Sequence, residues 1–174
     1  MKYMKFALAA LVAAALLTTT TMAATNAPVS TTGQWSLTLA GAGSTATTGP
    51  SDTAFGTTLS LGHTGTLLLP FEAGLRQGIA YSSTDGGNVL LSTRLYADWT
   101  LMRLGSVELL AGVAVGPDYG NQTLQWRLAP ELETRLWLKD DVYVFGRVSY
   151  GFVLNDSVTA EDKLVYGLGV GFRF

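Results

Sequence analysis

The sequence predicts an all-β protein: a closed, antiparallel, up-and-down transmembrane β-barrel of eight strands. Three observations support this prediction: a period-two alternation through most of the chain, small residues on one side of that alternation, and aromatic residues near strand ends on the other. Strict alternation of apolar and polar residues is typical of half-buried strands rather than of helices. Turn-forming residues separate the alternating segments, as consecutive antiparallel strands require.

The first 24 residues precede the alternating region and follow another pattern. Residues 1–5 contain two lysines and no acid, residues 6–17 are apolar, and small residues lead to Ala23 and Ala24. This order is typical of a secretory signal peptide. The apolar stretch is shorter than the roughly 20 residues of a membrane-spanning helix. We therefore expect residues 1–24 to be a cleaved signal peptide and residues 25–174 to form one barrel with short loops.

The composition excludes several classes of function. The chain has 174 residues, of which 48% are hydrophobic and 14% charged, and it contains no cysteine. Disulfides, thiolate catalysis and cysteine-based zinc sites are therefore excluded. The formal net charge of −2 offers no basic footprint for nucleic acid. We expect no nucleic-acid partner, no cofactor and no metal site.

Eight segments alternate, and the last is the clearest. In residues 163–174 every even position is apolar or aromatic, whereas the odd positions are glycine, valine or a cation. Most segments have about the 9 to 11 residues that a tilted strand needs to cross hydrocarbon. The two weakest are residues 33–41 and 55–61. Connections are expected at residues 41–52, 62–66, 82–88, 101–105, 117–121, 139–141 and 154–162.

The alternation alone leaves open which face is outside. A soluble barrel around an apolar ligand keeps its apolar side chains inside, whereas a membrane barrel presents them to lipid. The small residues lie on the charged face, as a narrow interior requires, and aromatic girdles on the apolar face are typical of membrane barrels. The expected girdles contain Trp35, Phe71, Trp99, Phe172 and Phe174 at one rim, and Phe55, Tyr81, Trp126, Tyr150, Phe152 and Tyr166 towards the other.

With the polar face inside, ten charged residues line the lumen. Since they are five acids and five bases, we expect them to pair with residues on neighbouring strands and to fill the barrel with a salt-bridge network. Eight strands leave no open aqueous pore, so a narrow ion path is the alternative. The ten residues are Glu72, Arg76, Arg94, Asp98, Glu108, Arg127, Glu131, Glu133, Arg135 and Arg147.

Acidic residues also concentrate in the expected outward loops. Solubility of the loop tips is the simplest interpretation, and a weak Ca²⁺ or Mg²⁺ bridge to lipid is the alternative, because hard cations favour carboxylate oxygens. We assign no metal site to them. These acids are Asp52, Asp85, Asp118, Asp156, Glu161 and Asp162.

The end of the chain contains a more specific motif. Residues 166–174 read Tyr-Gly-Leu-Gly-Val-Gly-Phe-Arg-Phe, an alternating strand that ends on Phe. This segment resembles the terminal strand of bacterial outer-membrane proteins, and the expected length and strand count are similar to those of small OmpA/OmpX-like barrels. The resemblance implies a monomer in a Gram-negative-type outer membrane that contacts lipids, including lipopolysaccharide, after delivery by periplasmic chaperones and the barrel assembly machinery. The implied assembly signal is Tyr166, Leu168, Val170, Phe172 and Phe174.

Evidence for catalysis is weak. Small outer-membrane enzymes that modify lipid A resemble this chain in size, and they use a serine with a histidine and an acid, or a similar polar set. The one histidine, His63, falls in an expected periplasmic turn without a nameable partner, and Ser149 has no candidate base. We therefore expect a non-enzymatic barrel that contributes to envelope structure or surface interaction. The alternatives are a narrow ion or small-solute channel, a lipid A-modifying enzyme and a soluble periplasmic ligand-binding barrel.

Overall fold

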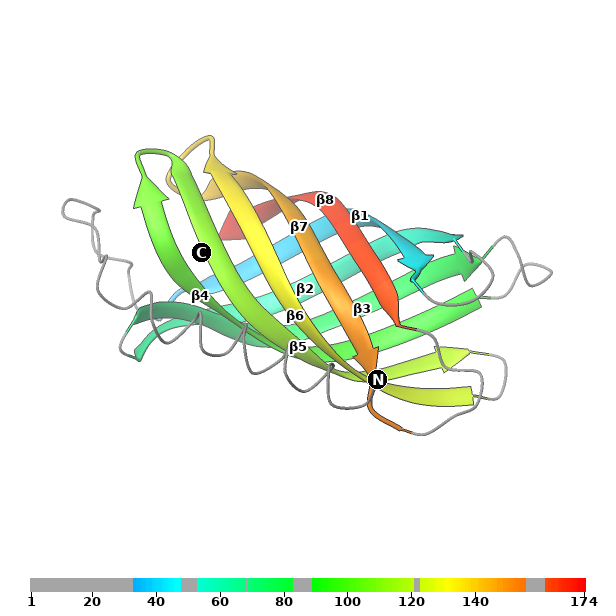
Figure 1. The fold of residues 1–174 in the computed structure, drawn as a ribbon. Coiled ribbons are helices and arrows are strands. Elements are labelled where there is room, and N and C mark those ends of the chain that lie inside the picture. The colour runs from blue at the N-terminus through cyan, green and yellow to red at the C-terminus, as the bar shows by residue number, and fades with distance from the viewer. Residues whose placement is uncertain (1–32, 48–52, 68, 83–88, 121–122, 156–161) are drawn as a thin grey trace.

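The computed structural model describes residues 33–47, 53–67, 69–82, 89–120, 123–155 and 162–174. Each strand pairs antiparallel with the next, and β8 pairs with β1 to close the barrel (Figure 1). The predicted eight-stranded antiparallel barrel is confirmed, whereas the predicted signal peptide lies outside the described residues. Among these residues, no helix is both long enough and apolar enough to cross a membrane. The strands are β1 (Trp35–Ala46), β2 (Thr53–Leu67), β3 (Leu69–Ser82), β4 (Val89–Leu104), β5 (Val107–Gly120), β6 (Thr123–Trp137), β7 (Val142–Val153) and β8 (Lys163–Arg173).

Several strands extend into segments predicted as connections. β1 continues past residue 41 to Ala46, β2 includes residues 62–66, β4 reaches Leu104, and β5 includes residues 117–120. These predicted boundaries are wrong because pairing with a neighbouring strand continues where the side chains become small or polar. His63 thus lies within β2, directly opposite Trp35, and their rings meet edge-on with centroids 5.0 Å apart.

The two ends of the barrel differ in their connections. At one end, called the hairpin end, short connections join β2 to β3, β4 to β5 and β6 to β7. Gly105, with a φ of +58°, makes a two-residue turn between Leu104 and Val107 that suits glycine. Trp35 and Phe174 exchange two backbone hydrogen bonds at the same end. The opposite end, called the loop end, holds the other four connections.

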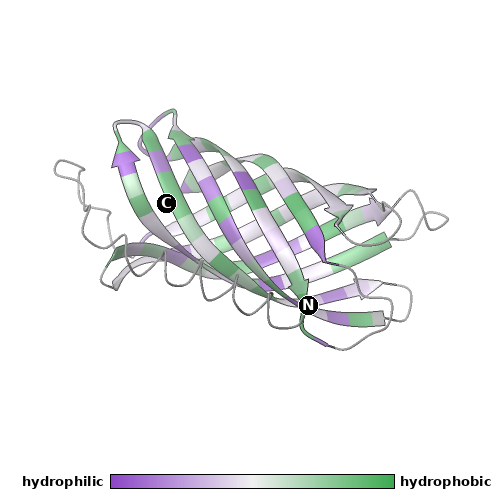
Figure 2. Ribbon diagram, viewed as in Figure 1, coloured by the Kyte–Doolittle hydropathy of each residue, from purple (hydrophilic) through white to green (hydrophobic). Residues whose placement is uncertain are grey.

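Apolar side chains cover the outside of the barrel, and charged side chains lie within it. Figure 2 shows hydrophobic and hydrophilic residues alternating along the strands. Leu95 and Leu168 expose 63% and 75% of their surface, whereas Glu133 and Arg135 each expose 1%. A soluble ligand-binding barrel requires the opposite distribution. The predicted outward-apolar arrangement is therefore confirmed, and it is the arrangement that suits a lipid surrounding.

The pairing register brings the outward aromatic residues together near the two ends. Phe71 lies opposite Trp99 at the hairpin end, and Phe55 lies opposite Tyr81 towards the loop end. Phe152 differs from the other expected girdle residues, because it is 6% exposed and its ring packs against Tyr150 at a centroid distance of 4.8 Å. The exposed members are Trp35, Phe55, Tyr81, Trp126, Tyr166, Phe172 and Phe174.

Candidate functional site

The lumen contains the candidate site, because all ten charged residues predicted for it lie on the inward face. Eight of them are buried, and the side chains of Arg94 and Arg147 are 12% and 10% exposed. Seven of the ten lie close together near the middle of the barrel and are called the central network. Its members are Glu72, Arg76, Asp98, Glu131, Glu133, Arg135 and Arg147.

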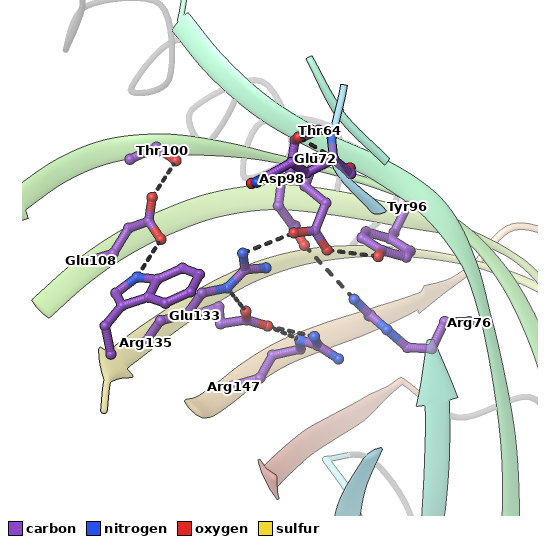
Figure 3. Close-up of polar contacts among 12 residues, drawn as sticks. Thr64, Glu72, Arg76, Tyr96, Asp98, Thr100, Glu108, Glu133, Arg135 and Arg147 are labelled. Carbon is purple, nitrogen blue, oxygen red and sulfur yellow. Dashed lines mark hydrogen bonds and ion pairs between the residues drawn. The ribbon is translucent and has the colours of Figure 1, made fainter. Parts of the chain in front are cut away.

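Arg135 links two acids of the central network (Figure 3). Its Nη1 donates to Glu72 Oε2 at 2.8 Å, and its Nε donates to Glu133 Oε1 at 2.5 Å. The other oxygen of Glu133 accepts from Arg147 Nε at 2.7 Å, while Tyr96 donates its hydroxyl to Glu72 at 2.9 Å. Residues of β3, β4, β6 and β7 are thus connected through charge-assisted hydrogen bonds, the stronger kind in proteins.

Arg76 forms the second part of the central network. Its two terminal nitrogens donate to the two oxygens of Glu131 at 2.8 and 3.1 Å, which is a bidentate pair. Its Nε donates to Ser60 at 3.2 Å, and its guanidinium lies 4.5 Å from the ring centroid of Tyr96. Asp98 is 3.8 Å away. Residues of three other strands, β2, β4 and β6, therefore hold this one guanidinium in place.

The prediction that partners lie on neighbouring strands is wrong for Glu72 of β3, whose partner Arg135 belongs to β6, three strands away around the barrel. For Arg76 of β3 it holds only for Asp98 of β4 at 3.8 Å, because the bidentate partner Glu131 also belongs to β6. Glycine leaves the space for this reach: a Cβ on Gly62 would lie 2.8 Å from both Glu72 Oε1 and Ser36 Oγ. Adjacent-strand pairing does hold for Arg147 with Glu133, and for Arg94 and Arg127 with Asp118.

Asp98 is the least satisfied member of the central network. It is 1% exposed, and neither carboxylate oxygen accepts a hydrogen bond from a described residue. Its nearest cation, Arg76, is already bound to Glu131. The central network therefore has four acids and three bases, and a buried acid in surplus destabilises the fold.

The hairpin end of the lumen is filled by aromatic side chains. Trp137, Tyr143 and Phe145 pack in series, with centroid distances of 4.7 and 6.1 Å. Arg173 lies 4.4 Å from the Trp137 ring centroid, and Glu108 accepts from Trp137 Nε1 at 3.1 Å. The alternation places these rings on the polar face, but it does not predict that they close one end of the lumen.

Asp118 is a luminal residue that the sequence analysis assigned to a loop. It lies within β5, where its carboxylate bridges Arg94 and Arg127. Arg94 also donates to the carbonyls of Gly116 and Pro117 at 3.0 and 2.7 Å. The predicted loop position is wrong because β5 continues to Gly120 and turns Asp118 inward.

Asp162, also predicted in a loop, is buried against the barrel wall. It is 5% exposed, and its Oδ1 accepts from the backbone nitrogen of Val153 at 3.2 Å. The other four acids of the expected outward loops lie outside the described residues. Within the described part of the chain, no group of three or more histidine or acidic residues is arranged to hold a metal ion.

The two residues considered for catalysis lie on different faces of the barrel wall. His63 is exposed against the outward Trp35, whereas Ser149 is buried in the lumen opposite Glu131 in the β6–β7 register. The structure therefore does not bring His63 and Ser149 together. No described histidine is placed to activate Ser149.

A cavity of about 150 Å³ lies between the Arg76–Glu131 pair and the loop end. Its walls include Ala114, Ala129 and Gly151, with Asp118 among the charged residues. The lumen is thus filled from the hairpin end to its middle, and hollow beyond the middle.

Comparison with known proteins identifies the class of fold. No protein family model and no curated protein matches the chain. Neisserial surface protein A is similar in structure, with a TM-score of 0.60, 14% identity, and coverage of 82% of this chain and 97% of that chain. Ail, the attachment invasion locus protein of Yersinia pestis, is similar as well; its structure was solved with the heparin analogue sucrose octasulfate. The TM-score is 0.53 and the identity 14%, and the match covers 82% of this chain and 99% of that chain.

The outer membrane enzyme PagL is also similar, with a TM-score of 0.53, 14% identity, and coverage of 76% of this chain and 98% of that chain. The chain therefore has the fold of the small outer-membrane β-barrels, and the predicted resemblance is confirmed at the level of fold. A surface protein and an enzyme share this fold, so the fold does not select one activity.

Proposed function

We propose that this chain is a non-enzymatic barrel of the outer membrane that contributes to envelope structure or surface interaction, exported through a cleaved signal peptide. The inverted distribution of side chains is the observation that supports a lipid location most directly. Leu39, Leu95 and Leu168 on the outer face expose 54%, 63% and 75% of their surface, while eight of the ten luminal charged residues are buried. A closed barrel also pairs its backbone groups between strands, which a chain in hydrocarbon requires.

Cell fractionation combined with gel mobility tests the location. The protein is expected in the outer-membrane fraction, with a band that shifts between unheated and boiled samples because a folded barrel resists the detergent. Recovery in the periplasmic fraction without a shift would contradict the proposal.

A pair of outward substitutions tests which solvent surrounds the barrel. Leu95 lies in the middle of β4 and Leu104 at its hairpin end, and they are similarly exposed, at 63% and 64%. In a bilayer an arginine near the midplane costs about 2–4 kcal/mol and one near the interface about 0–1 kcal/mol. Leu95→Arg should therefore destabilise the lipid-embedded barrel much more than Leu104→Arg. Equal effects would indicate an aqueous surrounding.

The filled lumen favours a closed scaffold over a channel. The central network and the Trp137–Tyr143–Phe145 cluster occupy the lumen from its middle to the hairpin end. We expect no steady conductance in planar bilayers for the native protein, and a gain for Glu131→Ala, which removes the partner of Arg76. A stable single-channel conductance of the native protein would support the narrow channel instead.

A lipid A-modifying activity is the enzymatic alternative, and PagL shows that a barrel of this fold can be an enzyme. The separation of His63 from Ser149 by the barrel wall argues against a catalytic pair here. Lipid A mass spectra should remain unchanged when the protein is overproduced. A new lipid A species that disappears in Ser149→Ala would overturn the non-enzymatic assignment.

We assign the signal that directs assembly of the proposed monomer to the last strand, β8. β8 closes the barrel against β1, and its outward residues Tyr166, Leu168, Val170 and Phe172 are exposed, as is Phe174 beyond it. We infer that periplasmic chaperones and the barrel assembly machinery bind this segment before closure. Phe174→Asp should lower outer-membrane levels, whereas Phe174→Leu should preserve them. Normal levels of Phe174→Asp would contradict this role.

A further inference from the structure

Two acids of the central network meet above a glycine of the barrel wall. Gly112 of β5 lies directly opposite Asp98 of β4 on one side and directly opposite Glu131 of β6 on the other. Because glycine has no side chain, the Asp98 carboxylate extends over it, and a Cβ on Gly112 would collide with Asp98 Oδ1. Neighbouring strands lie about 4.8 Å apart, so the backbones that carry the two acids are within about 10 Å of each other. Their side chains can therefore meet over Gly112.

The same two carboxyl groups lie against one nitrogen atom. Nη2 of Arg76 is 3.1 Å from Glu131 Oε1 and 3.8 Å from Asp98 Oδ2. The side chains of Asp98 and Glu131 are also within hydrogen-bonding distance of each other. An ionised carboxylate only accepts hydrogen bonds, so the two acids can bond to each other only when one of them is protonated. Two buried carboxylates that share a site rarely ionise together, because like charges disfavour each other.

The groups around Asp98 do not compensate a negative charge on it. Directly opposite Asp98 on β3 is Glu72, a further acid, and Tyr96 donates its hydroxyl to Glu72. Each cation of the central network donates to other acids: Arg76 to Glu131, Arg147 to Glu133, and Arg135 to Glu72 and Glu133. Asp98 is 1% exposed, and neither of its oxygens accepts a hydrogen bond from a described residue. A carboxyl group in such a position is cheaper to bury neutral than ionised.

We propose that Asp98 and Glu131 form a proton-binding site in the lumen, which holds one proton at neutral pH. Asp98 carries the proton and donates it to Glu131, which stays ionised because Arg76 binds both of its oxygens. The three remaining carboxylates of the central network then face three guanidiniums, so its buried charges are balanced. This inference concerns the chemistry of the lumen, and it goes beyond the envelope role proposed above and does not depend on it.

Infrared spectroscopy of the purified, folded barrel detects the proton directly, because a protonated carboxyl group has a C=O stretching band that an ionised carboxylate lacks. The native protein should show this band at neutral pH, and Asp98→Asn should abolish it. The matched control Asp118→Asn should keep it, because Asp118 is ionised between Arg94 and Arg127. Labelling aspartate carboxyls with ¹³C should shift the band, whereas labelling glutamate should not. Absence of the band, its persistence in folded Asp98→Asn, or a shift with labelled glutamate would overturn the proposal.

The pH dependence of unfolding gives an independent measurement. An aspartate of the unfolded chain is ionised above about pH 4, whereas folding returns a proton to Asp98, so raising the pH favours unfolding. The unfolding equilibrium constant of the native protein, divided by that of Asp98→Asn, should be at least about fivefold larger at about pH 7 than at about pH 5. The corresponding ratio for Asp118→Asn should change by less than about twofold, because Asp118 is ionised in both states. Equal pH dependence of the two ratios would overturn the proposal, even if the protein is found in the outer membrane.

Discussion

The two halves of the lumen share one alternation pattern but are packed differently. Towards the hairpin end, the inward residues of β7 are Tyr143, Phe145 and Arg147, and the lumen is filled. Towards the loop end, the same face of the same strand continues with Ser149 and Gly151, and the lumen is hollow. The period of the pattern therefore decides which side chains point inward, while their volumes decide whether the lumen is filled.

The ion pairs of the two halves differ in the same way. Arg135 and its partners Glu72 and Glu133 have side chains no more than 3% exposed. Asp118, which bridges Arg94 and Arg127, has a side chain 25% exposed. Removing one partner of a fully buried ion pair leaves a buried, unpaired charge. Removing one partner near the loop end leaves a charge that water can reach.

The largest expected effect on stability comes from removing the buried cation Arg135. Arg135→Leu leaves the buried Glu72 without its cation and Glu133 with Arg147 alone, and should lower the free energy of unfolding by about 3–5 kcal/mol. Arg94→Leu, at the loop end, should lower it by about 1 kcal/mol. Denaturant unfolding of both variants in lipid vesicles measures the difference. Similar losses of unfolding free energy would mean that water screens the charges of the two halves equally.

A volume test comes next. Ala40 is 3% exposed and packs with Trp137, Tyr143 and Phe145, so Ala40→Leu should overpack the filled half and cost about 2–3 kcal/mol. Ala129→Leu extends into the cavity and should change the free energy of unfolding by less than about 0.5 kcal/mol. Equal costs in the same unfolding assay would show that the hollow half cannot accommodate added volume.

Two glycines provide a finer version of the volume test. A Cβ on Gly112 would collide with the carboxylate of Asp98 and the carbonyl of Ala97, whereas a Cβ on Gly151 would make ordinary contacts from 3.6 Å outwards. Gly112→Ala should therefore cost about 1–2 kcal/mol. Gly151→Ala should be neutral or stabilise by up to about 1 kcal/mol, because alanine has fewer unfolded conformations. Thermal unfolding followed by circular dichroism distinguishes them, and equal shifts would contradict this reading of the packing.

The smallest expected effect is a gain in stability. Asp98→Asn removes the surplus acid of the central network while keeping the side-chain shape, and should stabilise the barrel by about 1 kcal/mol. Glu131→Gln is the control, and it should destabilise because Glu131 is bound by both terminal nitrogens of Arg76. Loss of stability in Asp98→Asn would show that the Asp98 charge is needed by Arg76.

The alternation pattern is sufficient to predict the fold class, the number of strands and the inward position of the ten charged residues. These features depend only on the period-two alternation, because a strand places successive side chains on opposite faces. The outward leucines and most of the aromatic girdle follow from the same local rule, as Leu95 and Phe55 illustrate.

The pairing of charges, the strand ends and the cavity depend on the tertiary structure instead. Arg76 pairs with Glu131, 55 residues away, because closure of the barrel brings β3 within reach of β6 across the lumen. Asp118 turns inward because the ladder between β5 and its neighbours continues past the turn-forming residues. The cavity exists because small side chains from several strands meet at one height. Register and closure combine residues far apart in sequence, and local periodicity contains no information about either.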